Sequence, residues 1–146
     1  MNRELSEELF KTQTGFCSDP GLLVLRSWKV VSSSYPLLEV DFFADGREPI
    51  RVKMLCDNWD ELPPSVDLLD TKGVPLPKFP QGIGHSIFNN SAHPRTGRPF
   101  LCTPGIREYH EHSSHVGDSW DNHKNKSAFD LGGILTQIWR AWGESQ

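Results

Sequence analysis

Apolar residues recur with helical spacing near the C-terminus. Counted from the first of them, they fall at offsets 0, 3, 4, 7, 8 and 11, which is one face of an α-helix. The residues are Leu131, Ile134, Leu135, Ile138, Trp139 and Trp142. Asp130 suits the N-cap position and Gly143 the stop. The pattern predicts a helix that buries this face, and we expect it to pack across a sheet.

The N-terminal segment predicts a shorter amphipathic helix over residues 3–12. Leu5 and Leu9 lie four residues apart, and Phe10 widens the same apolar stripe. Glu7 and Glu8 are good helix formers for the solvated side.

Three strand-like runs come next, over residues 21–31, 36–45 and 49–57. They are rich in Val, Leu, Ile, Phe and Trp, and turn sequences separate them. Asp45-Gly46 is a favoured hairpin pair. In the third run apolar and basic side chains alternate, which is typical of a strand with one solvated face.

Proline and glycine punctuate the rest of the chain. Pro63-Pro64 ends the third strand region, and residues 65–70 supply a fourth short strand. Residues 71–84 predict an irregular loop and residues 85–88 a brief extended piece. The predicted fold is α+β: an N-terminal helix, a four-stranded antiparallel meander, a long loop and a C-terminal crossing helix, in one domain over residues 1–146.

Composition and charge narrow the functional classes. The net charge of −4 does not favour nucleic acid or an anionic membrane surface as a partner. No apolar run reaches the roughly 20 residues of a membrane span, and the N-terminal segment is too polar for a secretory signal. The three cysteines, an odd number without paired spacing, predict reduced thiols in a cytoplasm.

Chemistry-bearing residues concentrate between His93 and Trp120. The segment holds Cys102, four of the six histidines and the carboxylates Glu108 and Glu111. Repeated Pro and Gly make it mostly loop, and loops carry chemistry on a scaffold. Cys102 has polar neighbours that can stabilise a thiolate, whereas Cys56 lies in an apolar run and is expected in the core.

These features, in this order, resemble the ubiquitin-conjugating enzymes in a diverged bacterial form. The resemblance rests on Trp59 before Pro63-Pro64, on His93-Pro94, and on Cys102 nine residues after His93. Trp120 and the final helix resemble the segment after the family's active cysteine. Arg95 stands where the family has an oxyanion-stabilising Asn, and the loop after Cys102 is longer and richer in histidine.

The resemblance implies ubiquitin-like protein conjugation in a bacterial pathway. Cys102 is then the nucleophile that accepts a ubiquitin-like protein from an activating enzyme as a thioester, and a target lysine amine attacks it. His93, His110 and Asp118 are the further candidate catalytic residues, His110 or Asp118 as base for the amine. Candidate oxyanion donors are Arg95, Asn89, Asn90 or backbone amides of the loop.

The same loop also resembles a small family named CEHH for its Cys, Glu and His residues, for which metal binding is expected. The matching residues are Cys102, Glu108, His110, His112 and His115. A thiolate, a carboxylate and imidazoles suit Zn²⁺. Cys102, Glu108, His110 and His115 give four ligands, and His112 competes for a place. In this alternative the protein is a zinc-binding adaptor of the same pathway.

Purely structural interpretations of the same residues remain alternatives to the thioester and zinc hypotheses. The histidines of a polar loop are often simply solvated, and His93 in such a His-Pro pair is more often structural than catalytic. Trp59, Trp120, Trp139 and Trp142 are expected in the core. An inactive scaffold that only docks the activating enzyme or the ubiquitin-like protein is the third hypothesis.

Overall fold

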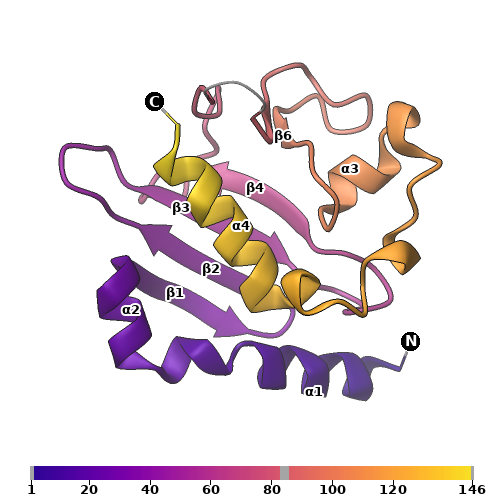
Figure 1. Cartoon of the computed structure of the whole chain (residues 1–146), viewed down its shortest axis with the longest axis horizontal. Helices are drawn as coiled ribbons and strands as arrows, with labels where there is room; N and C mark the ends of the chain where they lie inside the picture. The colour runs from indigo at the N-terminus through magenta and orange to yellow at the C-terminus, as the bar shows by residue number, and fades with distance from the viewer. Residues whose placement is uncertain (1, 83–85, 146) are drawn as a thin grey trace. The chain divides into compact units, whose positions relative to one another are not determined.

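The computed structural model describes residues 2–82 and 86–145 and shows an α+β fold (Figure 1). The chain divides into two compact units, Met1–Leu76 and Pro77–Gln146. Whether the two units form the single domain that the sequence predicts stays a prediction. No helix in the described part of the chain is long and apolar enough to span a membrane.

The first unit contains the predicted meander. Strands β1 (Trp28–Ser34), β2 (Leu37–Phe42), β3 (Ile50–Leu55) and β4 (Ser65–Leu69) pair antiparallel in sequence order. The expected hairpin turn is present: the Arg47 amide donates to the Ala44 carbonyl at 3.2 Å, and Gly46 has a φ of +71°. Because glycine carries no Cβ, it adopts this left-handed conformation without strain.

Alternation along the strands places the core on one face of the sheet. In β3, Ile50, Val52 and Met54 are buried, whereas Lys53 is exposed. On the other face Arg51 and Asp41 stand opposite each other in register, with Nε 2.7 Å from Oδ1. The predicted orientation of the third strand is confirmed.

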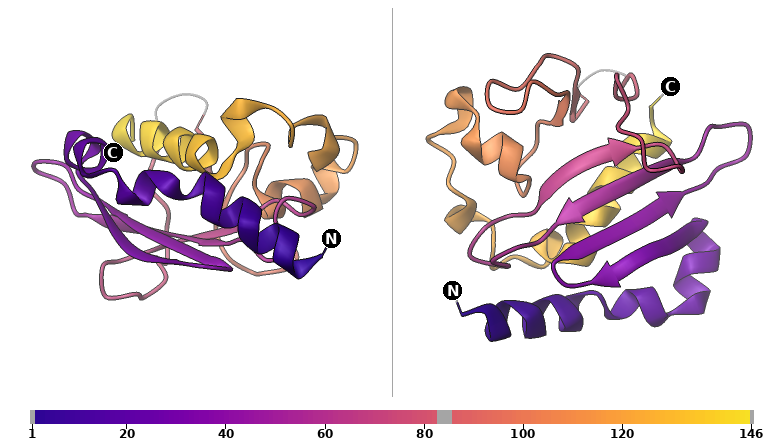
Figure 2. Two further views of the ribbon diagram at one scale, coloured as in Figure 1. Left: turned by 90° about the horizontal axis from the view of Figure 1, so that it is seen from below. Right: turned by 180° about the vertical axis from the view of Figure 1, so that it is seen from behind.

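Two helices precede the sheet. Helix α1 (Arg3–Gln13) matches the predicted N-terminal helix, with the Asn2 side chain as its N-cap. Helix α2 (Pro20–Arg26) corrects the predicted first strand, which was expected to begin at residue 21. Asp19 accepts a hydrogen bond from the Leu22 amide, and Pro20 occupies the first turn, where its missing N–H costs nothing. The two helices lie along the β1 side of the sheet in all the views (Figure 1, Figure 2).

The second unit has short elements joined by turns. These are β5 (Phe88–Asn89), β6 (Phe100–Leu101), α3 (Arg107–Glu111), α4 (Leu131–Gly143) and the 3-10 turns η2 (Ser113–His115), η3 (Trp120–Asn122) and η4 (Ser127–Phe129). Residues 71–82 are irregular, as predicted, and β5 begins at Phe88 in the expected extended piece. Residues 83–85, at the junction of those two predictions, lie outside the described residues.

Helix α4 confirms the clearest prediction from the sequence. The Asp130 carboxylate caps it by accepting a hydrogen bond from the Gly133 amide at 2.6 Å. Its periodic apolar residues are buried, except that Trp139 is only partly buried, so that tryptophan is not a full core residue. The predicted packing of this helix across the sheet stays a prediction.

Candidate functional site

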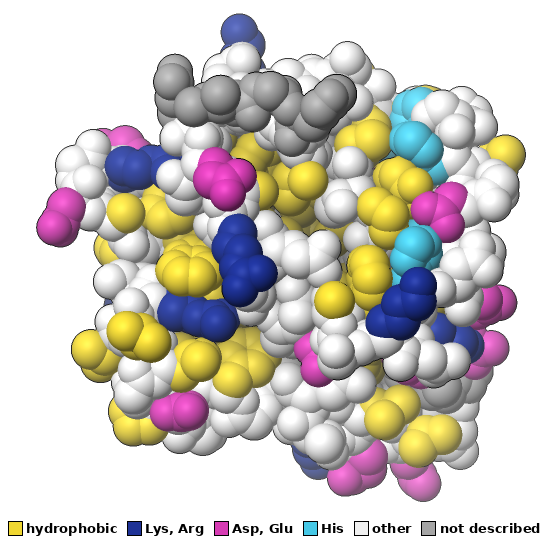
Figure 3. Space-filling view, in the orientation of Figure 1, with side chains coloured by type: hydrophobic (Ala, Val, Ile, Leu, Met, Phe, Trp, Pro, Cys, Tyr) yellow, Lys and Arg dark blue, Asp and Glu magenta, His cyan; other side chains and the backbone are white. Residues whose placement is uncertain are grey.

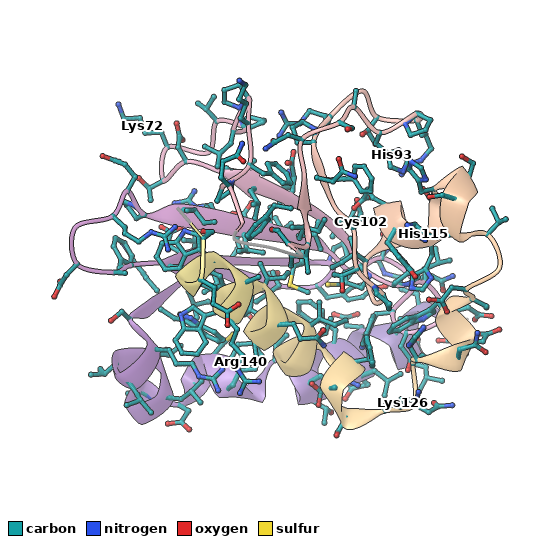
Figure 4. The ribbon with its side chains drawn as sticks, turned by 45° about the horizontal axis from the view of Figure 1, so that its top comes forward. Lys72, His93, Cys102, His115, Lys126 and Arg140 are labelled. Atoms are coloured by element: carbon teal, nitrogen blue, oxygen red, sulfur yellow. The ribbon has the colours of Figure 1, made fainter. Side chains whose placement is uncertain are left out.

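Cys102 and His115 form a close pair in the second unit. Cys102 directly follows β6, and its backbone amide donates to the Ile87 carbonyl at 2.6 Å, which extends the β5–β6 ladder by one residue. His115 ends η2, the turn after α3. The Cys102 Sγ lies 3.3 Å from the His115 Nε2, within hydrogen-bonding distance for sulfur (Figure 4).

The surroundings of the Cys102 thiol disfavour its ionised form. Cys102 is partly buried, and burial raises the pKa of its thiol because the thiolate loses hydration. The thiol therefore stays protonated at neutral pH unless a neighbour takes its proton. His115 Nε2 is placed to do so in the tautomer that carries its proton on Nδ1.

Aromatic contacts hold the imidazole of His115. Its ring stacks on Tyr109, with centroids 4.1 Å apart and planes inclined by 22°. His112 caps the turn that carries His115, since its Nδ1 accepts from the Ser114 amide at 3.1 Å and lies 2.7 Å from the Ser114 hydroxyl. The His112 ring in turn stacks on Phe100 of β6. The His115 imidazole is thus supported by side chains from both α3 and β6.

The Asp118 carboxylate is hydrogen-bonded to the Tyr109 hydroxyl and to His123. The Tyr109 hydroxyl donates to Asp118 Oδ2 at 2.7 Å, and His123 Nε2 lies 2.8 Å from Oδ1. These hydrogen bonds, from Tyr109 first, lower the pKa of Asp118 to about 2, while burial and the carboxylate raise the pKa of Tyr109 to about 12. A carboxylate with so low a pKa is a weak base, so the contacts favour an anchoring role over the predicted role in deprotonating the amine.

His110 uses both ring nitrogens within the loop. The Gly105 amide donates to Nε2 at 3.0 Å, so Nδ1 carries the proton and donates to the Asp118 carbonyl at 2.8 Å. Burial lowers the pKa of the His110 imidazole. A neutral ring with two occupied nitrogens favours a structural role over the predicted base.

His93, the third predicted catalytic histidine, is buried. Its Nδ1 accepts a hydrogen bond from the Arg95 amide at 3.1 Å, and its Nε2 lies 2.8 Å from the Glu108 carbonyl oxygen. The ring meets Phe100 edge to face. These contacts tie the loop after His93 to α3 and favour a structural role for His93, and its catalytic role stays a prediction.

The predicted oxyanion donors are mostly committed elsewhere. Arg95 Nη2 lies 2.6 Å from Glu111 Oε2 and 3.7 Å from Oε2 of the buried Glu108. The Asn90 side chain binds both backbone groups of Phe79. Asn89, by contrast, sits in β5 opposite Phe100, on the ladder that Cys102 extends, and its side-chain carbonyl accepts from the Ser91 amide.

The predicted zinc ligands do not converge. Within residues 2–82 and 86–145, no group of three or more His, Cys, Asp or Glu side chains is arranged to hold a metal ion. Cys102 and His115 meet, but both His110 nitrogens are occupied and Glu108 lies beside Arg95. This arrangement therefore does not fit a four-ligand zinc centre, and zinc binding stays a prediction.

Sequence reasoning missed two members of the site, Tyr109 and His123. It also grouped His115 with the metal ligands and not with the bases. No spacing rule in the loop singles out His115 from its neighbours, because its proximity to Cys102 depends on the turn at η2.

Histidine side chains reach the surface on the face of the molecule that Figure 3 displays, next to hydrophobic groups.

Comparison with known proteins finds similarity in the second unit. Residues 81–143 match the Y4jH-like family (Y4jH family). A protein of Sinorhizobium fredii (strain NBRC 101917 / NGR234), described as "Uncharacterized protein y4jH", is 44% identical over 41 residues. That match covers 28% of this chain and only 20% of the relative. The part of this chain that contains the Cys102 loop is thus similar to the Y4jH-like proteins.

Proposed function

We propose that the protein carries a ubiquitin-like protein as a thioester on Cys102 and transfers it to an amine. The observation that supports this is the 3.3 Å approach of Cys102 Sγ to His115 Nε2. Burial raises the pKa of the Cys102 thiol and so opposes ionisation, but a cysteine beside an imidazole is the nucleophile–base pair that covalent acyl transfer uses. The resemblance to ubiquitin-conjugating enzymes supplies the acyl group, the C-terminus of a ubiquitin-like protein.

The loading step exchanges one thioester for another. His115 Nε2 takes the Cys102 proton, and Sγ attacks the carbonyl carbon of the thioester on the activating enzyme. When the tetrahedral intermediate collapses, the bond to the activating enzyme's sulfur breaks, and that sulfur takes the proton back from His115. No net proton is gained or lost.

The discharge step moves the acyl group to a lysine. The neutral amine attacks the Cys102 thioester, the carbon–sulfur bond breaks, and an isopeptide bond forms. His115 accepts the proton that the amine loses and returns it to the Cys102 sulfur. The Asn89 amide and backbone amides of the loop are the proposed donors to the oxyanion.

A loading assay tests this function. The full chain is incubated with activating enzyme, ATP and the ubiquitin-like protein of a bacterial conjugation pathway. We expect an adduct that a thiol reductant removes, on wild type and on Cys17→Ser but not on Cys102→Ala. In Cys102→Ser the adduct should become an oxygen ester that resists the reductant.

The role of His115 is tested in the same assay. Loss of a general base typically costs 10²–10⁴-fold, so loading of His115→Ala should fall by about 100-fold or more. Ser113→Ala changes an exposed residue of the same turn and should load like wild type. A Cys102→Ala protein that still forms the reductant-sensitive adduct would overturn the proposal.

A further inference from the structure

We infer that Tyr109 is the positioning residue for His115, fixing the imidazole against the Cys102 sulfur. The inference deepens the proposed function and rests on it, since it assigns His115 its orientation as base. Tyr109 contacts the His115 ring and the Asp118 carboxylate, so we expect its effect on Cys102 to pass through His115.

The Tyr109 ring stacks on the His115 imidazole. The Tyr109 and His115 rings lie nearly parallel with centroids 4.1 Å apart. Among the residues that the structure describes, the other ring near His115 is that of His112, whose centroid lies 5.8 Å away with a tilt of 49°, so it offers no stacking surface. Offset stacking fixes the plane of a ring, and here it holds the plane in which Nε2 reaches the Cys102 sulfur.

Tyr109 is itself held in place by burial and by a hydrogen bond. Tyr109 is 9% exposed, and its hydroxyl donates to Asp118 Oδ2 at 2.7 Å. Asp118 is held in turn by His123 at its other oxygen, 2.8 Å away. A rotation of Tyr109 would break a hydrogen bond to a charged acceptor, and such bonds are stronger than neutral ones.

A backbone hydrogen bond links Asp118 back to His115. The Asp118 amide donates to the His115 carbonyl at 2.9 Å. Side-chain contacts therefore run from His115 to Tyr109 and on to Asp118, and a backbone hydrogen bond returns to His115. The imidazole and the main chain that carries it are fixed by the same two residues. A base held in this way needs no reorganisation before it takes the Cys102 proton.

Alkylation of Cys102 by iodoacetamide tests the inference without any partner protein. It is followed by mass spectrometry on the full chain in a Cys17→Ser background. Because misplacement of a reacting group by about 1 Å can cost 100-fold, Tyr109→Leu should slow the reaction at neutral pH between about 10-fold and about 100-fold. Tyr109→Phe keeps the ring and loses the tether, so it should fall between Tyr109→Leu and wild type.

Tyr35→Phe is the matched control, because Tyr35 is the other of the two tyrosines and its hydroxyl contacts the Asn58 amide in the first unit. It should leave the rate unchanged. A second readout separates positioning from loss of structure. At pH values where Cys102 is fully ionised the base is not needed, so the rates of wild type and the Tyr109 variants should converge.

The double variant gives the sharpest outcome. In His115→Ala, adding Tyr109→Leu should slow alkylation no further, because the residue through which Tyr109 acts is gone. Additive effects in the two variants, or an unchanged rate in both Tyr109→Leu and Tyr109→Phe, would overturn the inference. Normal loading in the thioester assay by Tyr109→Leu would also overturn it while leaving the proposed function intact. Slowed alkylation with no thioester on wild type would support the positioning role and refute the function.

Discussion

His93 is hydrogen-bonded to the backbone of α3: its Nε2 lies 2.8 Å from the carbonyl oxygen of Glu108, fifteen residues further along the chain. The ring is 2% exposed, and its other nitrogen accepts from the Arg95 amide. One imidazole thus joins the loop that precedes Cys102 to the helix beyond it. This contact favours a structural role for His93 over the catalytic role that the sequence suggested.

Replacement of His93 should therefore act on stability. His93→Ala removes the hydrogen bonds to the Glu108 carbonyl and from the Arg95 amide, so we expect a loss of about 1–3 kcal/mol in the free energy of unfolding. His93→Gln can still donate to the carbonyl and should lose less. Urea denaturation measures both. A fully stable His93→Ala that no longer forms the Cys102 thioester would instead support the catalytic role.

The sequence predicted the fold well where periodicity is strong. The alternation of Ile50, Val52 and Met54 and the helical spacing of the last apolar face each correspond to an element in the structure. It failed at residues 21–27, where the apolar run over residues 22–25 fits a buried strand and a short helix equally. The Asp19-Pro20 pair carried the correct signal, an N-cap followed by a first-turn proline.

The site was predicted less completely, for a physical reason. Cys102 stands out from its polar neighbours, but pairing it with His115 requires a chain reversal through α3 and η2. Four histidines fall in this loop, and local sequence gives each the same chemistry. Their hydrogen bonds separate the proposed base, His115, from the occupied rings of His93 and His110.

The ionisation of Tyr109 is a direct probe of its contact with Asp118. Burial and the nearby carboxylate raise its pKa from the ordinary 10.0 to about 12. Titration of tyrosinate absorbance in Tyr35→Phe isolates this group, and Asp118→Asn should lower the midpoint. Because the folded-state pKa lies above the unfolded one, the stability it contributes is complete below pH 10 and is lost as pH rises through about 12. An unchanged midpoint in Asp118→Asn would show that the hydrogen bond does not contribute to the raised pKa of Tyr109.

Asp118 predicts the opposite dependence in acid. Hydrogen bonds from Tyr109 and His123 lower its pKa from the ordinary 3.8 to about 2. Its contribution to stability is therefore present above pH 3.8 and is lost as pH falls through about 2. Denaturant midpoints measured across this range should decline less steeply in Asp118→Asn than in wild type. The exposed Asp121, changed to Asn, is the control, and an identical slope in wild type and Asp118→Asn would contradict the contact.

Zinc analysis separates the conjugating hypothesis from the adaptor hypothesis. Since both His110 nitrogens bind backbone groups and Glu108 lies beside Arg95, we expect protein purified without a histidine tag to carry no stoichiometric zinc. Intact mass under native and denaturing conditions measures this. Loss of one zinc on denaturation, absent from Cys102→Ala, would show that the loop rearranges around a metal and would favour the adaptor.

Gly105 should be the most restrictive glycine of the site loop. Its φ is +94°, and an added Cβ would approach Phe129 Cδ1 to 2.9 Å. Gly105→Ala combines left-handed strain, roughly 1–2 kcal/mol, with overpacking of about 1–3 kcal/mol. Because the Gly105 amide also donates to His110, the change should slow Cys102 alkylation as well.

Two other glycines of the same segment dissect this effect. Gly97 has a φ of +69° but open space around its Cα, so Gly97→Ala should show the strain alone, roughly 1–2 kcal/mol. Gly117 also has open space around its Cα and its φ lies outside the left-handed region, so Gly117→Ala should stay within about 0.5 kcal/mol of wild type. Denaturation of the three variants orders them. Equal losses of unfolding free energy in Gly105→Ala and Gly97→Ala would mean that the Phe129 ring moves aside for the added methyl group. The loop around Gly105 would then be less tightly packed than its contacts indicate.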